Sequence, residues 1–301
     1  MLAHDVTEKN ELSKLLHRLS LKSIDRNYNT YRCFAWPDTI SEHDYWMSKE
    51  LLTIYIADLY NNWSEQDLKQ LSKWESINFY SLNIHGIREL LIEVINRIHS
   101  SGFSELSEFL HHFIDEENEH MWFFSEFCRR YGNKVYPSIL FKSLKYEQPD
   151  RELEDLMVFA RILLFEEIVD FYNVKMAADV NLHSVIRQIN SIHHQEEVRH
   201  IAFGRKLVAF LYKKIAVKLS VDQHQVLERM LKGYLIYNLN AFYNPYVYKD
   251  LGIKDPLEFR AKLLRTEERA IFERRVIEKP MGFFLQIGLF SDDSLLPRVI
   301  I

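Results

Sequence analysis

Two stretches of this sequence decide its fold. Residues 111–120 read His-His-Phe-Ile-Asp-Glu-Glu-Asn-Glu-His, and residues 191–200 read Ser-Ile-His-His-Gln-Glu-Glu-Val-Arg-His. Both end in Glu-Glu-x-x-His, so the chain contains a weak internal repeat. Glu and His three residues apart lie about 60° apart on an α-helix and one turn along it, so both side chains reach one metal ion. The repeat therefore predicts two metal-binding helices in a pseudo-symmetric bundle.

The second motif has one more candidate ligand than the first. The two motifs themselves supply Glu117, His120, Glu197 and His200. His193 lies four residues before Glu197, and it falls within about 60° of the same helix face. A third ligand from this helix is therefore geometrically possible.

Two further carboxylates are expected, one from the helix that precedes each motif helix. Glu166 lies 31 residues before the glutamate of the second motif, and Glu89 lies 28 residues before that of the first. The local sequences Glu-Leu-Leu-Ile-Glu and Glu-Glu-Ile-Val-Asp begin at these two residues and align them. Glu93 and Glu167 are the respective alternatives on the same two helices.

The donor types indicate which metal the site would take. Four carboxylates and three imidazoles suit iron or manganese better than zinc, because structural zinc prefers thiolates and catalytic zinc usually has three protein ligands. Bridging carboxylates would hold two divalent ions close enough to bind O₂ between them. Ligand imidazoles also need an outer partner on the second ring nitrogen. We expect Glu116 and Glu196 each to accept a hydrogen bond from the ligand histidine of the opposite motif.

A single Glu-x-x-His motif carries little information, since composition alone produces roughly one in a chain of this size. The third copy, Glu108-x-x-His111, is rotated about 180° from Glu117 and is interpreted as a solvated face. Two motifs on separate helices, with upstream glutamates at similar spacing, favour a metal centre over a metal-free helical protein. Without metal, seven buried polar ligands would destabilise the fold.

Composition excludes several other classes of protein. Hydrophobic residues make up 47% and charged residues 27% of 301 residues, as in a folded chain, and 8 Gly and 7 Pro leave few turns. The net charge of −5 without a long basic run argues against nucleic acid, and no stretch reaches the roughly 18 apolar residues of a membrane span. Cys33 and Cys128 make neither a disulfide framework nor a zinc-thiolate site. The first residues lack the pattern of a signal peptide, so we expect a cytoplasmic protein.

The periodicity predicts one all-α domain over residues 1–301, with four long helices at its centre. Residues 1–40 are expected to form an N-terminal arm with a short helix, and helical periodicity then begins at about Ser41 and runs through Leu51 to Tyr55. The core helices occupy about 64–218, and residues 219–301 supply extra helices and a tail. The individual helices are predicted at about 64–100, 104–131, 150–178, 183–217, 220–242 and 255–275, the first beginning in a capping box at Ser64 and Asp67.

The order Glu, Glu-x-x-His, Glu, His-x-x-x-Glu-x-x-His resembles that of the p-aminobenzoate N-oxygenase (AurF-like) family of ferritin-like diiron oxygenases. The element that distinguishes this family from ordinary ferritin-like oxygenases is the extra histidine, here His193. The stretch from Trp74 to Glu89 also looks like the first ligand helix of the family. The resemblance covers about residues 70–210.

This resemblance implies a ferritin-like fold, usually a homodimer, and a centre of two iron ions (Fe²⁺/Fe³⁺), with manganese as the alternative. It implies O₂ as co-substrate, a peroxo-diferric oxidant, and oxidation of a small-molecule amine to a hydroxylamine, nitroso or nitro product of natural product biosynthesis. An external electron donor is expected, because the sequence has no flavin or nicotinamide motif. Phe113, Phe165 and Tyr172 lie on the ligand helices and are candidates for the substrate pocket, with core packing as the alternative reading.

Three other functions use similar ligands. A diiron hydroxylase acting on carbon would differ only in the shape of its pocket. Iron storage or peroxide detoxification needs only a minimal four-helix subunit, which 301 residues exceed. A radical-generating reductase subunit needs a tyrosine close to the metals, and the position one helical repeat after Glu117 is Phe124.

Overall fold

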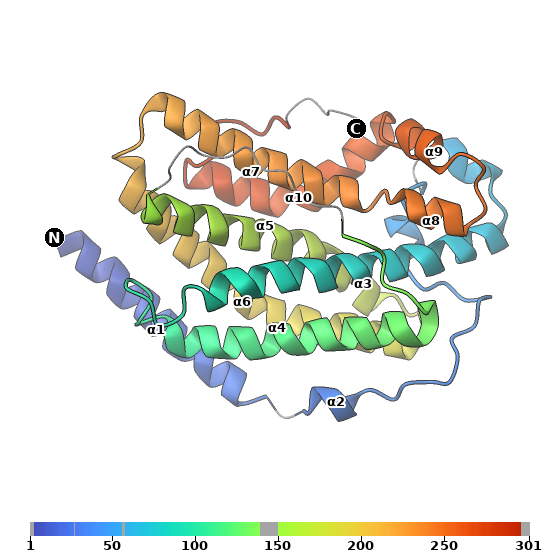
Figure 1. The fold of residues 1–301 in the computed structure, drawn as a ribbon, viewed down its shortest axis with the longest axis horizontal. Coiled ribbons are helices and arrows are strands. Elements are labelled where there is room, and N and C mark those ends of the chain that lie inside the picture. The colour runs from blue at the N-terminus through green and yellow to red at the C-terminus, as the bar shows by residue number, and fades with distance from the viewer. Residues whose placement is uncertain (1–2, 27, 56–57, 139–149, 296–301) are drawn as a thin grey trace.

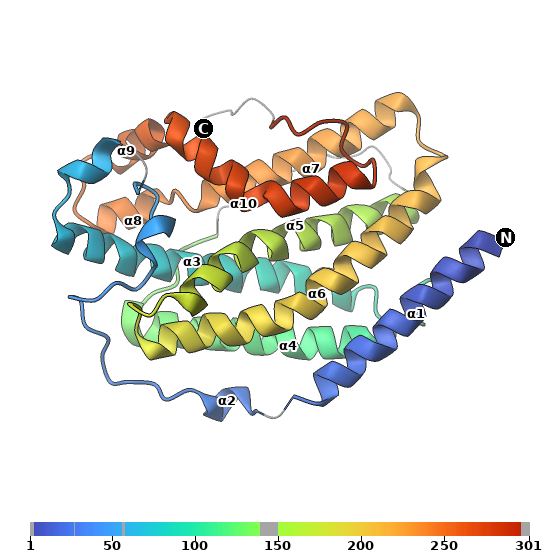
Figure 2. The same cartoon turned by 180° about the vertical axis from the view of Figure 1, so that it is seen from behind.

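The structure, a computed structural model, describes residues 3–26, 28–55, 58–138 and 150–295, and it is all-α over these ranges (Figure 1). Four long helices form the bundle: α3 (Glu65–Ile95), α4 (Ser107–Phe127), α5 (Arg151–Ala178) and α6 (Ser184–Ala216). Helices α3 and α4 form one antiparallel pair, and α5 and α6 form the other (Figures 1 and 2). The prediction of an all-α fold with four long central helices is confirmed.

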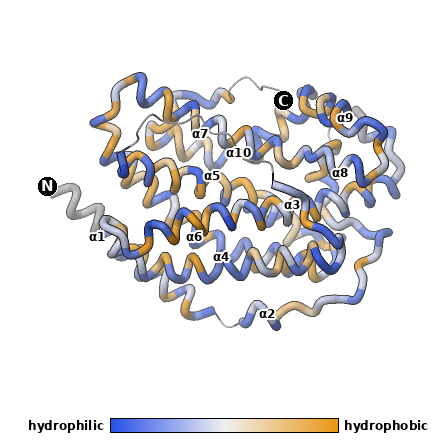
Figure 3. Tube along the Cα trace, in the orientation of Figure 1, coloured by the Kyte–Doolittle hydropathy of each residue, from blue (hydrophilic) through white to orange (hydrophobic). Residues whose placement is uncertain are grey.

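Further helices cover one side and one end of this bundle. Helices α7 (Val221–Ala241) and α10 (Glu267–Gln286) pack against α5, on the side of the bundle away from α4 (Figures 1 and 2). Helices α8 (Pro245–Asp250) and α9 (Pro256–Leu263) pack together beside the N-terminal half of α3. Hydrophobic and hydrophilic positions alternate along most helices (Figure 3), whereas α5 is buried on all sides over residues 162–170.

Side-chain caps begin helices α3, α5 and α7. The side chain of Ser64 accepts a hydrogen bond from the amide of Asp67, whose carboxylate accepts one from the amide of Ser64. This capping box satisfies two amides that the first turn of α3 leaves free, and it confirms the start predicted there. Asp150 caps α5, and Ser220 begins α7 in a second capping box.

The N-terminal residues differ from the short helix that was expected. Helix α1 (Ala3–Ile24) is 22 residues long and packs against α4 and α6. Its contact face carries Leu12, Leu16 and Leu19, which are buried at helical spacing. A short helix α2 (Thr30–Cys33) follows and packs on α4.

The prediction of a helix that begins near Ser41 was also wrong. Over residues 41–63 the described part of the chain has only 3₁₀ turns, at Lys49–Leu51 and Asp58–Asn62. Leu51, Leu52 and Ile54 are nevertheless buried. Their apolar pattern reflects packing of an irregular segment onto the bundle, which mimics helical periodicity over a short window. In the described residues, no helix is long and apolar enough to cross a membrane.

Near its N-terminal end, α3 buries a carboxyl group that lies outside the predicted metal site. Glu75 accepts hydrogen bonds from both the amide and the hydroxyl of Thr53, and the same hydroxyl lies 3.2 Å from the hydroxyl of Tyr248. Burial raises the pKa of Glu75 to about 8, and the two bonds from Thr53 only partly oppose this. Glu75 therefore keeps its proton at neutral pH.

We expect Glu75→Gln to stabilise the protein increasingly as the pH rises from 5 to 8. The unfolded chain releases this proton above its ordinary pKa of 4.5, whereas the folded protein holds it to about 8. The stability contributed by the neutral carboxyl is thus fully present below pH 4.5 and is lost towards pH 8, by on the order of 3 kcal/mol. Denaturant unfolding at several pH values measures this; the exposed Glu89→Gln on the same helix is the control. A constant difference between variant and parent across this range would refute the argument.

Candidate metal centre

Helices α4 and α6 present both sequence motifs to the interior of the bundle. Glu117 and His120 come from α4, and Glu197 and His200 from α6; all four side chains are at most 1% exposed. One potential ligand atom from each lies within 4.8 Å of the other three. Two elements that are 80 residues apart in sequence thus form one cluster, because the helical spacing places each Glu-His pair on a single face.

The two glutamates lie between the two histidines. Glu117 Oε1 is 3.5 Å from Nδ1 of His120 and 2.8 Å from Nδ1 of His200. The Glu197 carboxylate has one oxygen 3.6 Å from Nδ1 of His120 and the other 3.5 Å from Nδ1 of His200. Each carboxylate therefore approaches both imidazoles, as carboxylates shared between two metal ions would.

His193 and Glu166 complete the interior set. The Nε2 atom of His193 lies 2.7 Å from Glu197 Oε1, and its ring centroid lies 4.5 Å from that of His120. The Asn173 amide nitrogen lies 2.7 Å from His193 Nδ1. The other atom of this amide, Asn173 Oδ1, has no partner among the described residues. If the amide is rotated by about 180°, Oδ1 accepts a hydrogen bond from Nδ1 of His193. The proton of the ring then lies on Nδ1, and Nε2 is available to bind a metal. Glu166, from α5, is fully buried beside these groups.

Outside the cluster, each motif histidine meets a glutamate of the other motif. His120 Nε2 donates to Glu196 Oε2 at 2.7 Å, and His200 Nε2 donates to Glu116 Oε2 at 2.9 Å. These crossed hydrogen bonds hold a proton on each Nε2 atom, so the Nδ1 atom of each ring faces the interior and could bind a metal once it is unprotonated. Arg199 supports Glu116 through a contact of 2.6 Å.

The buried carboxylates of the cluster favour positive charge beside them. Burial would lower the pKa of His120, but Glu117 and Glu196 outweigh it and raise the pKa to about 10. Burial likewise opposes the charge on His200, and the neighbouring carboxylates, Glu197 first, hold its pKa well above the usual range. Burial and then the charge of Glu197 raise the pKa of Glu166. Without metal, bound protons on these side chains thus balance the buried negative charge, as metal ions would.

The interior atoms also have unfilled bonding capacity. Among the described residues, six of them lack a hydrogen bond of acceptable geometry: Glu117 Oε1, His120 Nδ1, Glu166 Oε1 and Oε2, Glu197 Oε2 and His200 Nδ1. Leaving one such buried atom unpaired costs about 1–3 kcal/mol, so a group of six requires an explanation. Oxygen and imidazole donors without thiolate match iron or manganese. The residues present therefore fit a centre of two metal ions.

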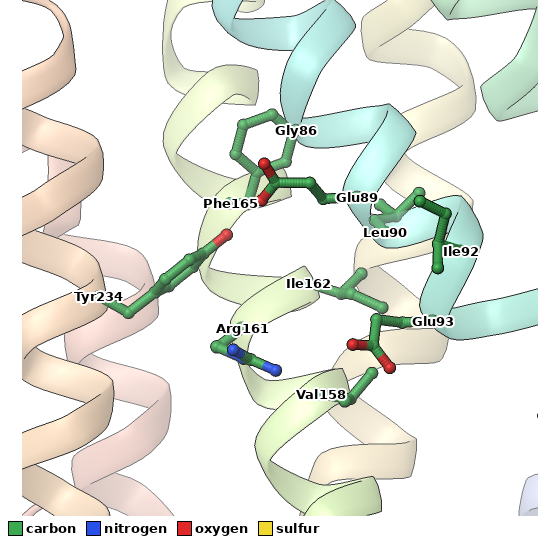
Figure 4. A pocket seen from close by; sticks show the side chains of 10 residues that line it. All are labelled: Gly86, Glu89, Leu90, Ile92, Glu93, Val158, Arg161, Ile162, Phe165 and Tyr234. Atoms are coloured by element: carbon green, nitrogen blue, oxygen red, sulfur yellow. The ribbon is translucent and has the colours of Figure 1, made fainter. Parts of the chain in front are cut away.

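The structure does not bring Glu89 into this cluster. Its side chain is 50% exposed, and it lines a cavity with Gly86, Phe165 and Tyr234 (Figure 4). Its neighbours Ile87, Leu90 and Leu91 are buried, whereas Glu89 itself lies on the exposed side of α3. The alternative, Glu93, pairs with Arg97 at 2.6 Å.

The reason lies in the α3–α4 connection. It spans residues 96–106 and contains two residues in the left-handed region, His99 and Gly102. The turn between α5 and α6 is shorter. Two residues separated by a similar number of positions are therefore level with each other along the bundle in α5 and α6, but not in α3 and α4. On α5, Glu167, the alternative to Glu166, forms a two-bond pair with Arg205 at 2.7 Å and is thereby occupied outside the cluster.

We therefore expect Glu89→Gln to retain the metal stoichiometry of the parent protein, because its half-exposed carboxylate lies outside the interior cluster. Iron content after anaerobic loading and gel filtration measures this. Glu166→Gln, prepared alongside, removes a buried interior carboxylate and should lose metal. Loss of metal from Glu89→Gln to the same extent would place its carboxylate in the centre after all.

The three predicted pocket residues have different surroundings. Phe165 lines the cavity described above. Phe113 is buried against the ring of His200, with centroids 4.4 Å apart, and Tyr172 stacks on Phe242 at 4.4 Å. Phe113 and Tyr172 thus both pack against other rings, and their place in a substrate pocket stays a prediction. Phe124, the position tested for a radical-forming tyrosine, lies 4.9 Å from the His193 ring.

Sequence reasoning missed several residues that support the cluster. Asn173 and Arg199 lie on the ligand helices, but nothing in their spacing distinguishes them. Arg26 and Tyr28 both contact Glu196 from positions about 170 residues away along the chain. The sequence shows only that both residues lie in the N-terminal arm, and it does not indicate that they contact Glu196.

Comparison with known proteins gives the family. The sequence profile of the family described as P-aminobenzoate N-oxygenase AurF matches residues 9–288. The chain belongs to this family. The resemblance inferred from the motif order is thereby confirmed, and with it the ferritin-like character of the all-α fold.

Three proteins similar to this chain are mycobacterial. They carry the names uncharacterized protein Rv0885 and uncharacterized protein MT0908, both of Mycobacterium tuberculosis, and uncharacterized protein Mb0909 of Mycobacterium bovis. Each is 25% identical over 213 residues, which cover 67% of this chain. The match spans 62% of the length of these relatives. Their names assign no reaction, so the activity rests on the family and on the buried Glu/His cluster.

Proposed function

We propose that this protein is a non-haem diiron N-oxygenase that uses O₂ to oxidise the amine of a small molecule. The observation that carries the proposal is the buried cluster of Glu117, His120, Glu197 and His200 with its unpaired interior atoms. Membership of the AurF family supports the same reaction class.

The side chains divide into those that would hold metal and those that orient them. Two metal ions would be held by Glu117, Glu197 and Glu166 together with His120, His193 and His200. When bound, two iron ions would supply the redox chemistry that activates O₂. Three interior carboxylates leave two divalent ions with an excess positive charge, which favours oxygen ligands from outside the protein. The reducing electrons would come from an external donor.

We place the substrate in the cavity between α3, α5 and α7 (Figure 4). Its volume of about 230 Å³ is below the roughly 300–1,000 Å³ of sites for drug-sized ligands, which favours a small molecule. Phe165 forms part of its wall. This ring lies so close to Gly86 that a β-carbon there would be 2.2 Å from it, and Phe165 directly precedes the interior residue Glu166. We propose that this ring separates the cavity from the metal cluster.

The apolar lining of this cavity includes Leu90, Val158 and Ile162, which suit the hydrocarbon part of an amine. Glu89 and Arg161 place charge at its edge. A homodimer is a further part of the proposal, and sedimentation of the metal-loaded protein tests it.

The function is tested by loading the protein with Fe(II) without oxygen and then mixing it with ¹⁸O₂. The test substrates are small aryl and alkyl amines, each paired with the analogue in which a methyl group replaces the amine. We expect about two irons per chain and ¹⁸O on nitrogen in at least one amine product, detected by mass spectrometry. His193→Ala should lose the reaction, and the exposed His111→Ala should retain it. Label on carbon would assign a hydroxylase, and absence of stoichiometric iron would overturn the proposal.

A further inference from the structure

The segment that follows α1 reaches the outer side of the metal cluster. The hydroxyl of Tyr28 donates to Glu196 Oε1 at 2.5 Å, and the guanidinium of Arg26 donates to the same oxygen at 3.1 Å. The other oxygen of Glu196 accepts the hydrogen bond from His120 at 2.7 Å. A continuous series of contacts therefore joins the N-terminal segment to an interior histidine.

Further contacts hold this segment against α4. Arg26 lies 2.7 Å from Glu119 and 3.5 Å from Asp115, and Thr30 donates to Glu119 at 2.5 Å. Glu119 and Glu196 are largely buried, so these interactions are poorly screened by solvent. The contacts fix the guanidinium of Arg26 between the two helices that carry the metal motifs.

The two halves of the centre differ in this respect. Glu116, which holds His200, receives its second contact from Arg199 of α6, at 2.6 Å. That half is therefore supported entirely by the bundle. In the other half, the closest contacts to Glu196 besides His120 come from Arg26 and Tyr28, and Arg199 is more distant at 3.5 Å.

We propose that Arg26 and Tyr28 are positioning residues for the metal ion held by His120, whereas the ion held by His200 does not depend on them. This rests on the two-metal centre of the proposed function. A carboxylate that accepts from a ligand histidine sets the orientation and basicity of its ring, and loss of such a partner typically lowers metal affinity about 10–100-fold. Without Arg26 and Tyr28, Glu196 loses both donors on one oxygen and no longer holds the His120 ring in place.

The test is an anaerobic titration of the full-length protein with Co(II), followed by calorimetry and by the ligand-field absorption of the bound ions. In the parent protein two ions bind. In Tyr28→Phe and Arg26→Gln we expect one binding step to weaken about 10–100-fold and the other to remain unchanged. The Co(II) absorption of the weakened site should also change, which a loss of general stability would not produce. Arg26→Lys keeps the charge and should recover part of the affinity.

Two variants calibrate this result. Tyr31→Phe, on the same segment, removes a hydroxyl from an exposed ring that packs at a tilt against Trp122, and it should bind both ions normally. Glu116→Gln should weaken the other step instead. Equal weakening of both steps, or parent-like binding in Tyr28→Phe and Arg26→Gln, would overturn the inference. If the parent itself fails to bind two ions, the proposed function fails instead, so the two failures are distinguishable. Should Tyr28→Phe fold poorly, the pair Arg26→Gln and Arg26→Lys decides.

Discussion

Glu197→Gln is expected to abolish binding of the metal pair and, with it, all O₂-dependent chemistry. This carboxylate lies 2.7 Å from His193 and approaches both His120 and His200 at about 3.5 Å. It is thus the residue in contact with the most candidate ligands, and an amide cannot bridge two cations as a carboxylate does. The loss in affinity should exceed the roughly 10–100-fold that removal of an outer partner causes.

Iron content after anaerobic loading, together with the mid-point of thermal unfolding with and without Fe(II), measures this effect. Glu108→Gln is the matched control, because it alters a Glu-x-x-His motif on the exposed side of α4. That variant should bind metal as the parent does. Retention of two irons by Glu197→Gln would show that the interior cluster is not the metal centre.

The second large effect is expected in Glu166→Gln, whose change in the free energy of unfolding should have opposite signs with and without metal. Both carboxylate oxygens of Glu166 lack a partner among the described residues, and burial raises the pKa of the group. Replacing this buried carboxyl by a neutral amide should stabilise the metal-free protein by about 1–3 kcal/mol. The variant should, however, lose much of the stabilisation that metal provides, which for the parent is about 2.7 kcal/mol at a metal concentration of 100 times Kd.

Denaturant unfolding of the metal-free and the metal-loaded protein measures the change in the free energy of unfolding in each form. Glu167→Gln, at the adjacent position, breaks the pair with Arg205 and should leave the metal-dependent part unchanged. If Glu166→Gln destabilises the metal-free protein, then the interior carboxyl is satisfied without metal, and the case for an unfilled centre weakens.

Much of the site was determined by the sequence alone, for a local reason. The positions of Glu117 with His120, and of His193 with Glu197 and His200, follow from the helical repeat, which depends only on neighbouring residues. The same periodicity yielded the four long helices, and the order of the motifs with the extra His193 carried the resemblance to the family. Glu166 could be placed as well, because the turn between α5 and α6 is short enough for chain spacing to report height along the bundle.

The tertiary structure alone decided what depends on distant parts of the chain. Glu89 lies outside the cluster because residues 96–106 shift the register of α3 against α4, and a spacing rule cannot detect this. Leu51, Leu52 and Ile54 are buried without being in an α-helix, since burial against the bundle outweighs local propensity. Arg26 and Tyr28 reach Glu196 only because α1 docks on α4 and α6. Helical repeats act over a few residues, whereas packing joins residues that no local pattern connects.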